Sequence, residues 1–214
     1  EYSRFDWNIP YMKPRYNGGG NCVPWISDIK LSPFDSDTAL FNTGTGLFMI
    51  TGLASGDVLV KPFCEGIEET VHLNVYTTPH GRNRIIDIIG DLGGFAFEDY
   101  DSECENSFAN ENGDRYITCL NADLTLSDPE YIVATPRGNW TGKTKGGLIL
   151  SKDCGSTWER LPMPRGLSEF IDKKLDNIEK PNVDSGWAAI SADGKRIMWA
   201  VAGGRGFSNK AVCY

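Results

Sequence analysis

The sequence is poor in histidine, in long apolar runs and in positive charge, and each shortage excludes a class of protein. Its two histidines do not accompany a serine or cysteine in a triad arrangement, so a hydrolase of that type is not expected. No apolar run is long enough to span a membrane. A net charge of −8 disfavours nucleic acid and anionic membranes as partners, and leaves neutral polymers such as polysaccharides.

Metal-ligand and cofactor patterns are missing as well. The sequence has no Cys-x-x-Cys pair, no histidine-containing ligand cluster and no glycine-rich phosphate loop, so no metal and no cofactor is expected. Aromatic residues are plentiful instead, at 11% of the chain with six tryptophans. Proteins that stack on sugar rings have such a composition, although most of these aromatic residues are expected to pack in the core.

Cysteine is the main indication of a cellular compartment. An even number of cysteines without metal-ligand spacing predicts three disulfides in an oxidising environment. The six are Cys22, Cys64, Cys104, Cys119, Cys154 and Cys213. Loop closure alone favours Cys104–Cys119 as one pair. The acceptor sequence at Asn139 agrees with a secreted, extracellular glycoprotein, and a presequence is expected to have been removed before Glu1.

Glycine and proline interrupt the sequence so often that helices have little room. The one helical candidate is 166–180, interpreted as a short surface insertion. The rest predicts an all-β fold of short strands and turns in a single domain, 1–214, with 1–24 as an N-terminal extension or incomplete blade. A strand–turn–strand unit recurs at intervals of about 50 residues, which is typical of β-propeller blades and predicts about four of them. The turns of this unit lie at 32–33, 78–82, 127–130 and 191–194.

The most specific local motif is SKDCGSTW, residues 151–158, which has the form of an Asp-box. In such a turn the aspartate and hydroxyls bond backbone amides, glycine supplies a positive φ, and the tryptophan packs inside. We therefore interpret Asp153 as architectural. The motif indicates a propeller and says little about function, because sialidases and unrelated propellers share it.

Several blocks of sequence, taken in order, carry a family resemblance. They are WISDIKLSPFDSDTALFNTGTGLFMITGL, GIEETVHLNVYTTP, GDLGGFAFEDYD, GGLILSKDCGSTWERLP and GWAAISADGKRIMWA. Together they resemble the second propeller of glycoside hydrolase family 74, the xyloglucanases, over residues 25–214. The resemblance implies a pair of seven-bladed propellers around a cleft that cuts β-1,4-glucan backbones bearing xylose.

The same resemblance implies a catalytic residue. Hydrolysis in the family inverts the anomeric centre, which requires an acid and a base roughly 6.5–9.5 Å apart. One of them is the aspartate of a GDxGGF block, and Asp91 matches that position in this sequence. Its partner lies in a TDxGG block of the first propeller, which this chain lacks. The alternative is that Asp91 is a turn residue bonding its own backbone.

Candidate substrate-binding residues surround this position or follow from the blocks. Gly93 and Gly94 let the backbone turn sharply beside a sugar, and Phe95 or Phe97 offers a stacking plane. The remaining candidates are Glu69, Trp140 and Asp28. Glu68 and Glu69 are equally well explained as solvated strand-end charges. Trp140 lies in a polar loop and is expected to be exposed, whereas Trp25 is expected to be buried in a blade.

The length also predicts a partner. Seven blades of about 45 residues need more than about 300 residues, so a second polypeptide is expected to complete the ring, with Cys213 as a candidate bond at the end of the chain. A four-bladed propeller that closes alone is the alternative.

Two other functions stay open. One is a secreted propeller, derived from such enzymes, that binds carbohydrate or protein without hydrolysis. The polar segment between Cys104 and Cys119 favours it, because a loop beside Asp91 would shape or block the cleft. The other is a sialidase, although the arginines of the chain do not stand in a recognisable sialidase setting.

Overall fold

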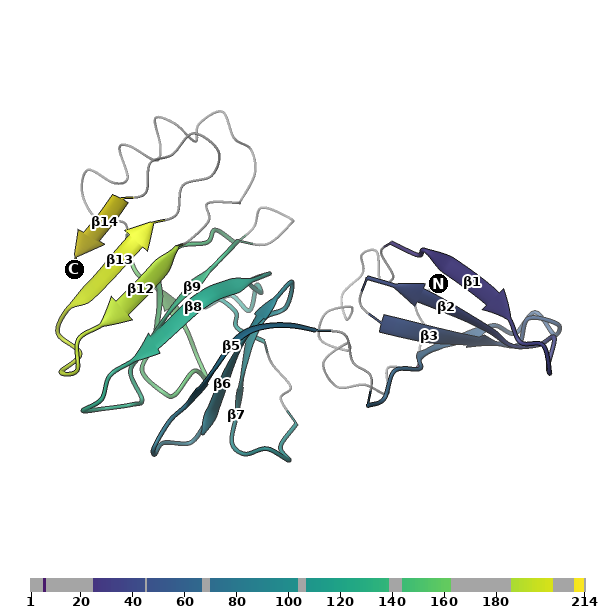
Figure 1. The fold of residues 1–214 in the computed structure, drawn as a ribbon, viewed down its shortest axis with the longest axis horizontal. Coiled ribbons are helices and arrows are strands. Elements are labelled where there is room, and N and C mark those ends of the chain that lie inside the picture. Colours follow the sequence, from purple (N-terminus) through teal and green to yellow (C-terminus); the bar gives the residue numbers. More distant parts are fainter. Residues whose placement is uncertain are drawn as a thin grey trace. The chain divides into compact units, whose positions relative to one another are not determined.

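The computed structural model describes residues 6, 25–44, 46–66, 70–103, 107–138, 144–162, 186–201 and 210–213. These residues form fourteen β-strands and no helix, so the predicted all-β class is confirmed (Figure 1). The candidate helix at 166–180 lies outside the described residues, as do Cys22, Glu68, Glu69, Cys104, Asn139 and Trp140. The chain divides into two compact units, Glu1–Thr70 and Val71–Tyr214.

The first unit contains one antiparallel sheet with its strands in chain order. The strands are β1 (Asp28–Leu31), β2 (Ala39–Thr43), β3 (Gly46–Thr51) and β4 (Leu59–Pro62). Every second residue of β2 is buried, which is the period of a strand with one covered face. Phe41 of β2 lies directly opposite Phe48 of β3, and their rings stack with centroids 5.2 Å apart. This pair and the buried Cys64 form the core of the unit.

The described residues of the second unit form three antiparallel sheets, each with its strands in consecutive chain numbering. The first has β5 (Val71–Thr77), β6 (Ile85–Gly90) and β7 (Gly93–Phe97). The second has β8 (Cys119–Leu124), β9 (Ile132–Pro136), β10 (Ile149–Ser151) and β11 (Glu159–Arg160). The third has β12 (Trp187–Ile190), β13 (Ile197–Val201) and β14 (Lys210–Cys213).

The sheet β8–β11 lies between the other two. On one face Ile132 and Ala134 of β9 pack with Ile86 and Ile88 of β6. On the other face Val133 packs with residues of β12 and β13, including the buried Trp199. β9 is therefore buried on both faces, which explains its unbroken run of apolar and small residues.

The first strands of neighbouring sheets are joined by side chains of β8. Asn121 Oδ1 accepts the Ala188 N–H at 2.8 Å, and Asp123 Oδ2 accepts the Ile190 N–H at 2.9 Å. A step of two residues along β8, from Asn121 to Asp123, corresponds to a step of two residues along β12, from Ala188 to Ile190. The two strands therefore run in the same direction. They also satisfy backbone donors at the edge of β12 that would otherwise lack a partner in the sheet. Among the described residues the three sheets form a row and do not close into a ring.

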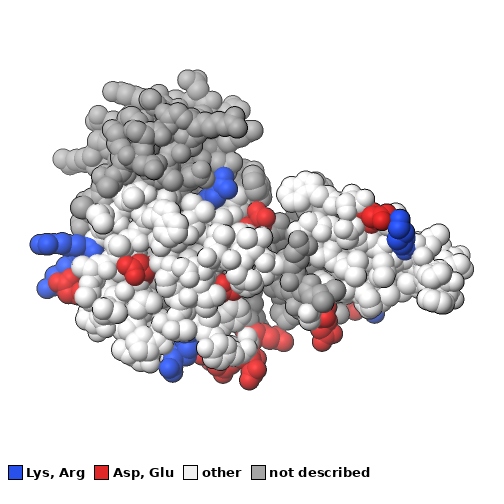
Figure 2. All heavy atoms as spheres, viewed as in Figure 1, with Lys and Arg blue, Asp and Glu red and all other residues white. Residues whose placement is uncertain are grey.

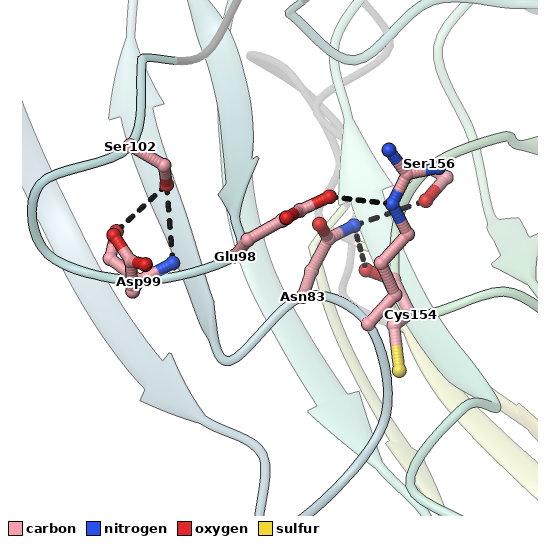
Figure 3. Close-up of polar contacts among 7 residues, drawn as sticks. Asn83, Glu98, Asp99, Ser102, Cys154 and Ser156 are labelled. Carbon is pink, nitrogen blue, oxygen red and sulfur yellow. Dashed lines mark hydrogen bonds and ion pairs between the residues drawn. The ribbon is translucent and has the colours of Figure 1, made fainter.

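The turn at 151–158 has the hydrogen bonds expected of its sequence. Asp153 accepts the Thr157 N–H at 2.8 Å, Ser151 Oγ accepts the Gly155 N–H at 2.7 Å, and Gly155 has a φ of 82°. Trp158 is buried in the core between the first two sheets of the unit. The turn is also bound from the β5–β6 connection, where Asn83 Nδ2 donates to Cys154 O at 2.9 Å and to Ser156 Oγ at 3.0 Å (Figure 3).

The cysteines correct one prediction. Cys64, Cys119 and Cys154 are buried free thiols, which contradicts their assignment to disulfides and the Cys104–Cys119 pair. Cys119 is enclosed in β8, with its Sγ 3.3 Å from Asn121 O, and burial raises the pKa of its thiol to about 12. Cys154 lies in the 151–158 turn, so close to Gly81 that a Cβ at Gly81 would lie 2.2 Å from its Sγ. Packing, rather than pairing, accounts for both positions.

Candidate functional site

Asp91 stands in the turn between β6 and β7, at the strand end where the sequence predicted it. Its side chain is exposed, and its φ of 61° lies in the left-handed region that non-glycine residues seldom adopt. Its N–H donates to Thr118 Oγ1 at 2.9 Å. Because Thr118 directly precedes β8, the exposed carboxylate lies at the end of this unit where β5 and β8 begin.

The glycines after Asp91 have a packing function. Gly93 has a φ of 83°, and a Cβ there would lie 2.8 Å from Tyr116 O. A Cβ on Gly94 would lie 2.6 Å from the Phe108 ring. Both residues are buried, so their small size serves contact with the segment 107–118. The predicted sharp turn agrees with the positive φ of Gly93, and a position of the two glycines beside a sugar stays a prediction.

Phe95 corrects a second prediction. It is only 4% exposed and packs against Phe97 with ring centroids 6.1 Å apart, so it presents no open face for stacking. Phe97 is half-buried at the far end of β7 from Asp91. The two rings lie on the same face of β7 because residues two apart on a strand share a face, and the burial of Phe95 shows that this face is covered there.

Two candidates lie in the first unit. Asp28, the first residue of β1, is exposed and pairs with Lys30 Nζ at 3.0 Å. That contact, together with the Ile29 N–H, holds the pKa of Asp28 below its ordinary value. Trp25 is 70% exposed, which contradicts the expected burial; its ring lies against Gly44, where a Cβ would come within 2.8 Å of it.

The sequence analysis missed a histidine–aspartate contact near Asp91. His72 Nδ1 of β5 lies 2.8 Å from Asp87 Oδ2 of β6, and Asp87 is 6% exposed. His72 pairs with Ile89 in the register, two residues before Asp91. An aspartate within the isoleucine run of β6 was the available signal, because a buried carboxylate requires a partner.

Asp153 and its turn lie at the opposite end of the β8–β11 sheet from Asp91. Cys119, next to Thr118, pairs with Pro136, whereas Ser151 pairs with Ile132 at the other end of β9. This position agrees with an architectural role for Asp153 and separates it from the Asp91 turn.

Other kinds of site find no support in the described residues. They contain no group of three or more histidine, cysteine, aspartate or glutamate side chains arranged to hold a metal ion. A search of the same residues finds no helix long and apolar enough to cross a membrane. Figure 2 shows lysine and arginine as separate patches among acidic side chains on the face drawn there.

Comparison with known proteins gives a consistent answer, although no family model matches the chain. A xyloglucanase of Paenibacillus sp. is 24% identical over an alignment 229 residues long, gaps included. The alignment covers 96% of this chain and 20% of that protein. An oligoxyloglucan-reducing end-specific xyloglucanase of Emericella nidulans is 26% identical over 213 residues, which cover 92% of this chain and 24% of that protein.

Solved structures agree on the fold. The GH74 xyloglucanase of Xanthomonas campestris matches with a TM-score of 0.66 at 20% identity, covering 98% of this chain and 27% of that one. The chain is similar to a segment of the family 74 glycoside hydrolases. A GH74 enzyme of Niastella koreensis matches with a TM-score of 0.65 at 18% identity. The resemblance predicted from sequence is confirmed, and the chain spans only 20–24% of the length of these two curated relatives.

Proposed function

We propose that this chain is part of a family 74-like β-propeller glycoside hydrolase that cuts the β-1,4-glucan backbone of xyloglucan, with Asp91 as one of its two acid/base carboxylates. The observation that carries the proposal is the setting of Asp91. It is exposed, sits in a left-handed turn and is bonded to the neighbouring sheet through Thr118. Gly93 and Gly94 are buried against the segment 107–118, whereas Asp91 is exposed to solvent.

The second carboxylate is expected to come from a part of the protein beyond these residues. The share of the relatives that the chain covers supports this expectation. So does the outer face of β12 and β13, where Trp187 and Met198 are 63% and 53% exposed while the opposite face is buried. An apolar sheet face of this kind suits a further blade, from the same or a second chain.

Secretion belongs to the same proposal. Because three of the cysteines are buried free thiols, disulfides do not support secretion. The glycosylation acceptor sequence at Asn139 supports it.

The test is release of reducing ends from xyloglucan and from unbranched β-1,4-glucan by the full-length protein. Replacement of an acid/base group typically costs about 10²–10⁴-fold in rate, so Asp91→Asn should reduce turnover by that much. Asp101→Asn is a matched control, because Asp101 is another exposed turn aspartate in the same unit. Equal turnover by Asp91→Asn and wild type would remove Asp91 from the mechanism.

The second candidate function is a propeller that binds carbohydrate or protein without hydrolysis. The segment 107–118 favours it, since it packs directly against the Asp91 turn. Retention of xyloglucan on a column by wild-type protein, with no reducing ends released over the full range of pH, would support this candidate over the first.

A further inference from the structure

The backbone of Asp91 is held in a conformation that costs energy. A left-handed φ is unfavourable for residues that carry a Cβ, although aspartate adopts it more readily than most, so surrounding contacts help to hold it. One contact that holds it is the 2.9 Å hydrogen bond from the Asp91 N–H to Thr118 Oγ1. Thr118 is 8% exposed, so little water is available to replace its hydroxyl as acceptor.

Thr118 ends a segment, residues 107–118, that we call the clasp. The clasp begins beside β7, where Ser107 bridges Phe95 and the Phe108 N–H donates to Gly94 O at 2.9 Å. It then folds back on itself, with the Tyr116 N–H donating to Phe108 O at 3.0 Å. It returns to β7 at its end, where Thr118 bridges Gly93.

The clasp can pack this closely against β7 because the β7 residues that face the clasp are glycines. A Cβ on Gly93 or Gly94 would come within 3 Å of Tyr116 O or the Phe108 ring. The two glycines that follow Asp91 are therefore matched to the clasp, and the clasp brings the Thr118 hydroxyl to the Asp91 N–H.

Thr118 is itself anchored to the next sheet. Its carbonyl accepts the Arg137 N–H at 2.7 Å, and Cys119, which follows it, begins β8. The Thr118 hydroxyl therefore links the Asp91 turn to the β8–β11 sheet. A hydroxyl in a loop without such an anchor would not fix the turn relative to that sheet.

We propose that Thr118 is a positioning residue: the clasp uses its hydroxyl to hold Asp91 in the left-handed turn that aims the carboxylate. The proposal rests on the proposed function of Asp91 for its effect on turnover. Its effect on the backbone of Asp91 is independent of any activity.

The experiment compares Thr118→Val, which keeps the shape and removes the acceptor, with Thr118→Ser, which keeps the acceptor. In the full-length protein we expect Thr118→Val to lower kcat on xyloglucan about ten- to a hundredfold with little change in KM, since a displacement near 1 Å can cost that much. Thr118→Ser should restore most of the loss. Amide hydrogen exchange at Asp91 should be faster in Thr118→Val and near wild type in Thr118→Ser.

Thr125→Val is the matched control for general damage. Thr125 is also a buried threonine next to β8, but at its other end, where its hydroxyl bonds Asp128 O. The Thr125→Val variant should be less stable than wild type, with the same kcat and the same rate of amide hydrogen exchange at Asp91.

The outcomes separate the two proposals. Unchanged Asp91 exchange in Thr118→Val overturns the positioning role, whatever the activity. If wild-type protein does not cut xyloglucan, the proposed function fails, and faster Asp91 exchange that is rescued by serine still supports the positioning role. Equal losses of kcat in Thr118→Val and Thr118→Ser would assign the loss to packing and overturn it.

Discussion

His72 and Asp87 join the edge strand β5 to β6 through a 2.8 Å contact between Nδ1 and Oδ2. Asp87 is buried, and its Oδ1 has no hydrogen-bond partner among the described residues, whereas His72 is half exposed. A buried carboxylate that loses such a contact retains its full desolvation cost. His72→Ala should therefore lower the free energy of unfolding by about 1–3 kcal/mol in urea denaturation.

The double variant His72→Val/Asp87→Val tests the reason for that loss. The double variant removes the buried Asp87 carboxylate together with its contact, so no buried polar group is left without a partner and the double variant should be more stable than His72→Ala. Lys152→Ala is the control, because it removes an exposed ion pair with Glu159 in the same unit and should change stability by less than about 1 kcal/mol. A double variant less stable than His72→Ala would show that the His72–Asp87 contact stabilises the fold by more than the cost of burying the Asp87 carboxylate.

Tyr116 gives a prediction of opposite sign. Its ring is buried in the core of the second unit, and its hydroxyl has no hydrogen-bond partner in the part of the chain that the structure describes. Removing a buried hydroxyl without a partner relieves a desolvation cost, so Tyr116→Phe should raise the free energy of unfolding by about 1 kcal/mol. A loss of stability would reveal a partner for that hydroxyl.

The same residue sets a pH dependence. Burial raises the pKa of Tyr116 from 10.0 to about 12. Between these values the unfolded chain releases the phenolic proton while the folded chain keeps it, so the wild-type protein is unaffected below pH 10.0 and loses stability as pH rises toward about 12. The advantage of Tyr116→Phe over wild type should grow across this range, as measured by denaturation at successive pH values.

The sequence was sufficient for features that depend on neighbouring residues. The position of Asp91 at a strand end and the hydrogen bonds of the 151–158 turn are local, since both follow from glycine, aspartate and hydroxyl residues a few positions apart. The alternating burial of β2 is local in the same sense, because it follows the two-residue period of a strand. What the sequence did not show was which faces other segments cover, so Trp25 was expected to be buried and Phe95 to be open.

The His72–Asp87 pair shows why some contacts escape a periodic pattern. Val75 lies opposite Asp87 and Asn74 opposite Ile88, so regular pairing would place Leu73 opposite Ile89. An irregularity between His72 and Asn74 puts His72 there instead, on the face that carries Asp87. The bond between Asp91 and Thr118 escapes for another reason: the two residues are 27 positions apart and meet only through the fold of the clasp.

Thiol chemistry provides a direct check on the cysteines. Cys64, Cys119 and Cys154 are buried, and burial raises the pKa of the Cys119 and Cys154 thiols, so little thiolate is available at neutral pH. We expect none of the three to react with iodoacetamide in the folded protein, and all three to react after unfolding in urea without reductant. Peptide mass mapping assigns each site; a thiol that is released only by reductant would restore the disulfide at that position.

Asp153 should matter for stability and not for activity. Its carboxylate accepts bonds from the Thr157 N–H at 2.8 Å, Thr157 Oγ1 at 2.6 Å and Ser151 Oγ at 2.8 Å. Asp153→Ala removes all of these and should lower the free energy of unfolding by about 1–3 kcal/mol. Thr157→Val, which removes one, should cost less.

The acid range tests whether the charge of Asp153 is responsible. Burial opposes its ionisation, but the bonds from Thr157 and Ser151 outweigh burial and lower the pKa of Asp153 below 3.8. The stabilisation is therefore complete above pH 3.8 and is lost as pH falls below it, so the gap between wild type and Asp153→Ala should narrow there. Under the proposed function, the folded variant should cut xyloglucan at the wild-type rate at neutral pH, because its turn lies at the other end of the sheet from Asp91. A reduced rate in folded Asp153→Ala would instead connect the two ends of the sheet and count against Asp91 acting from its own turn.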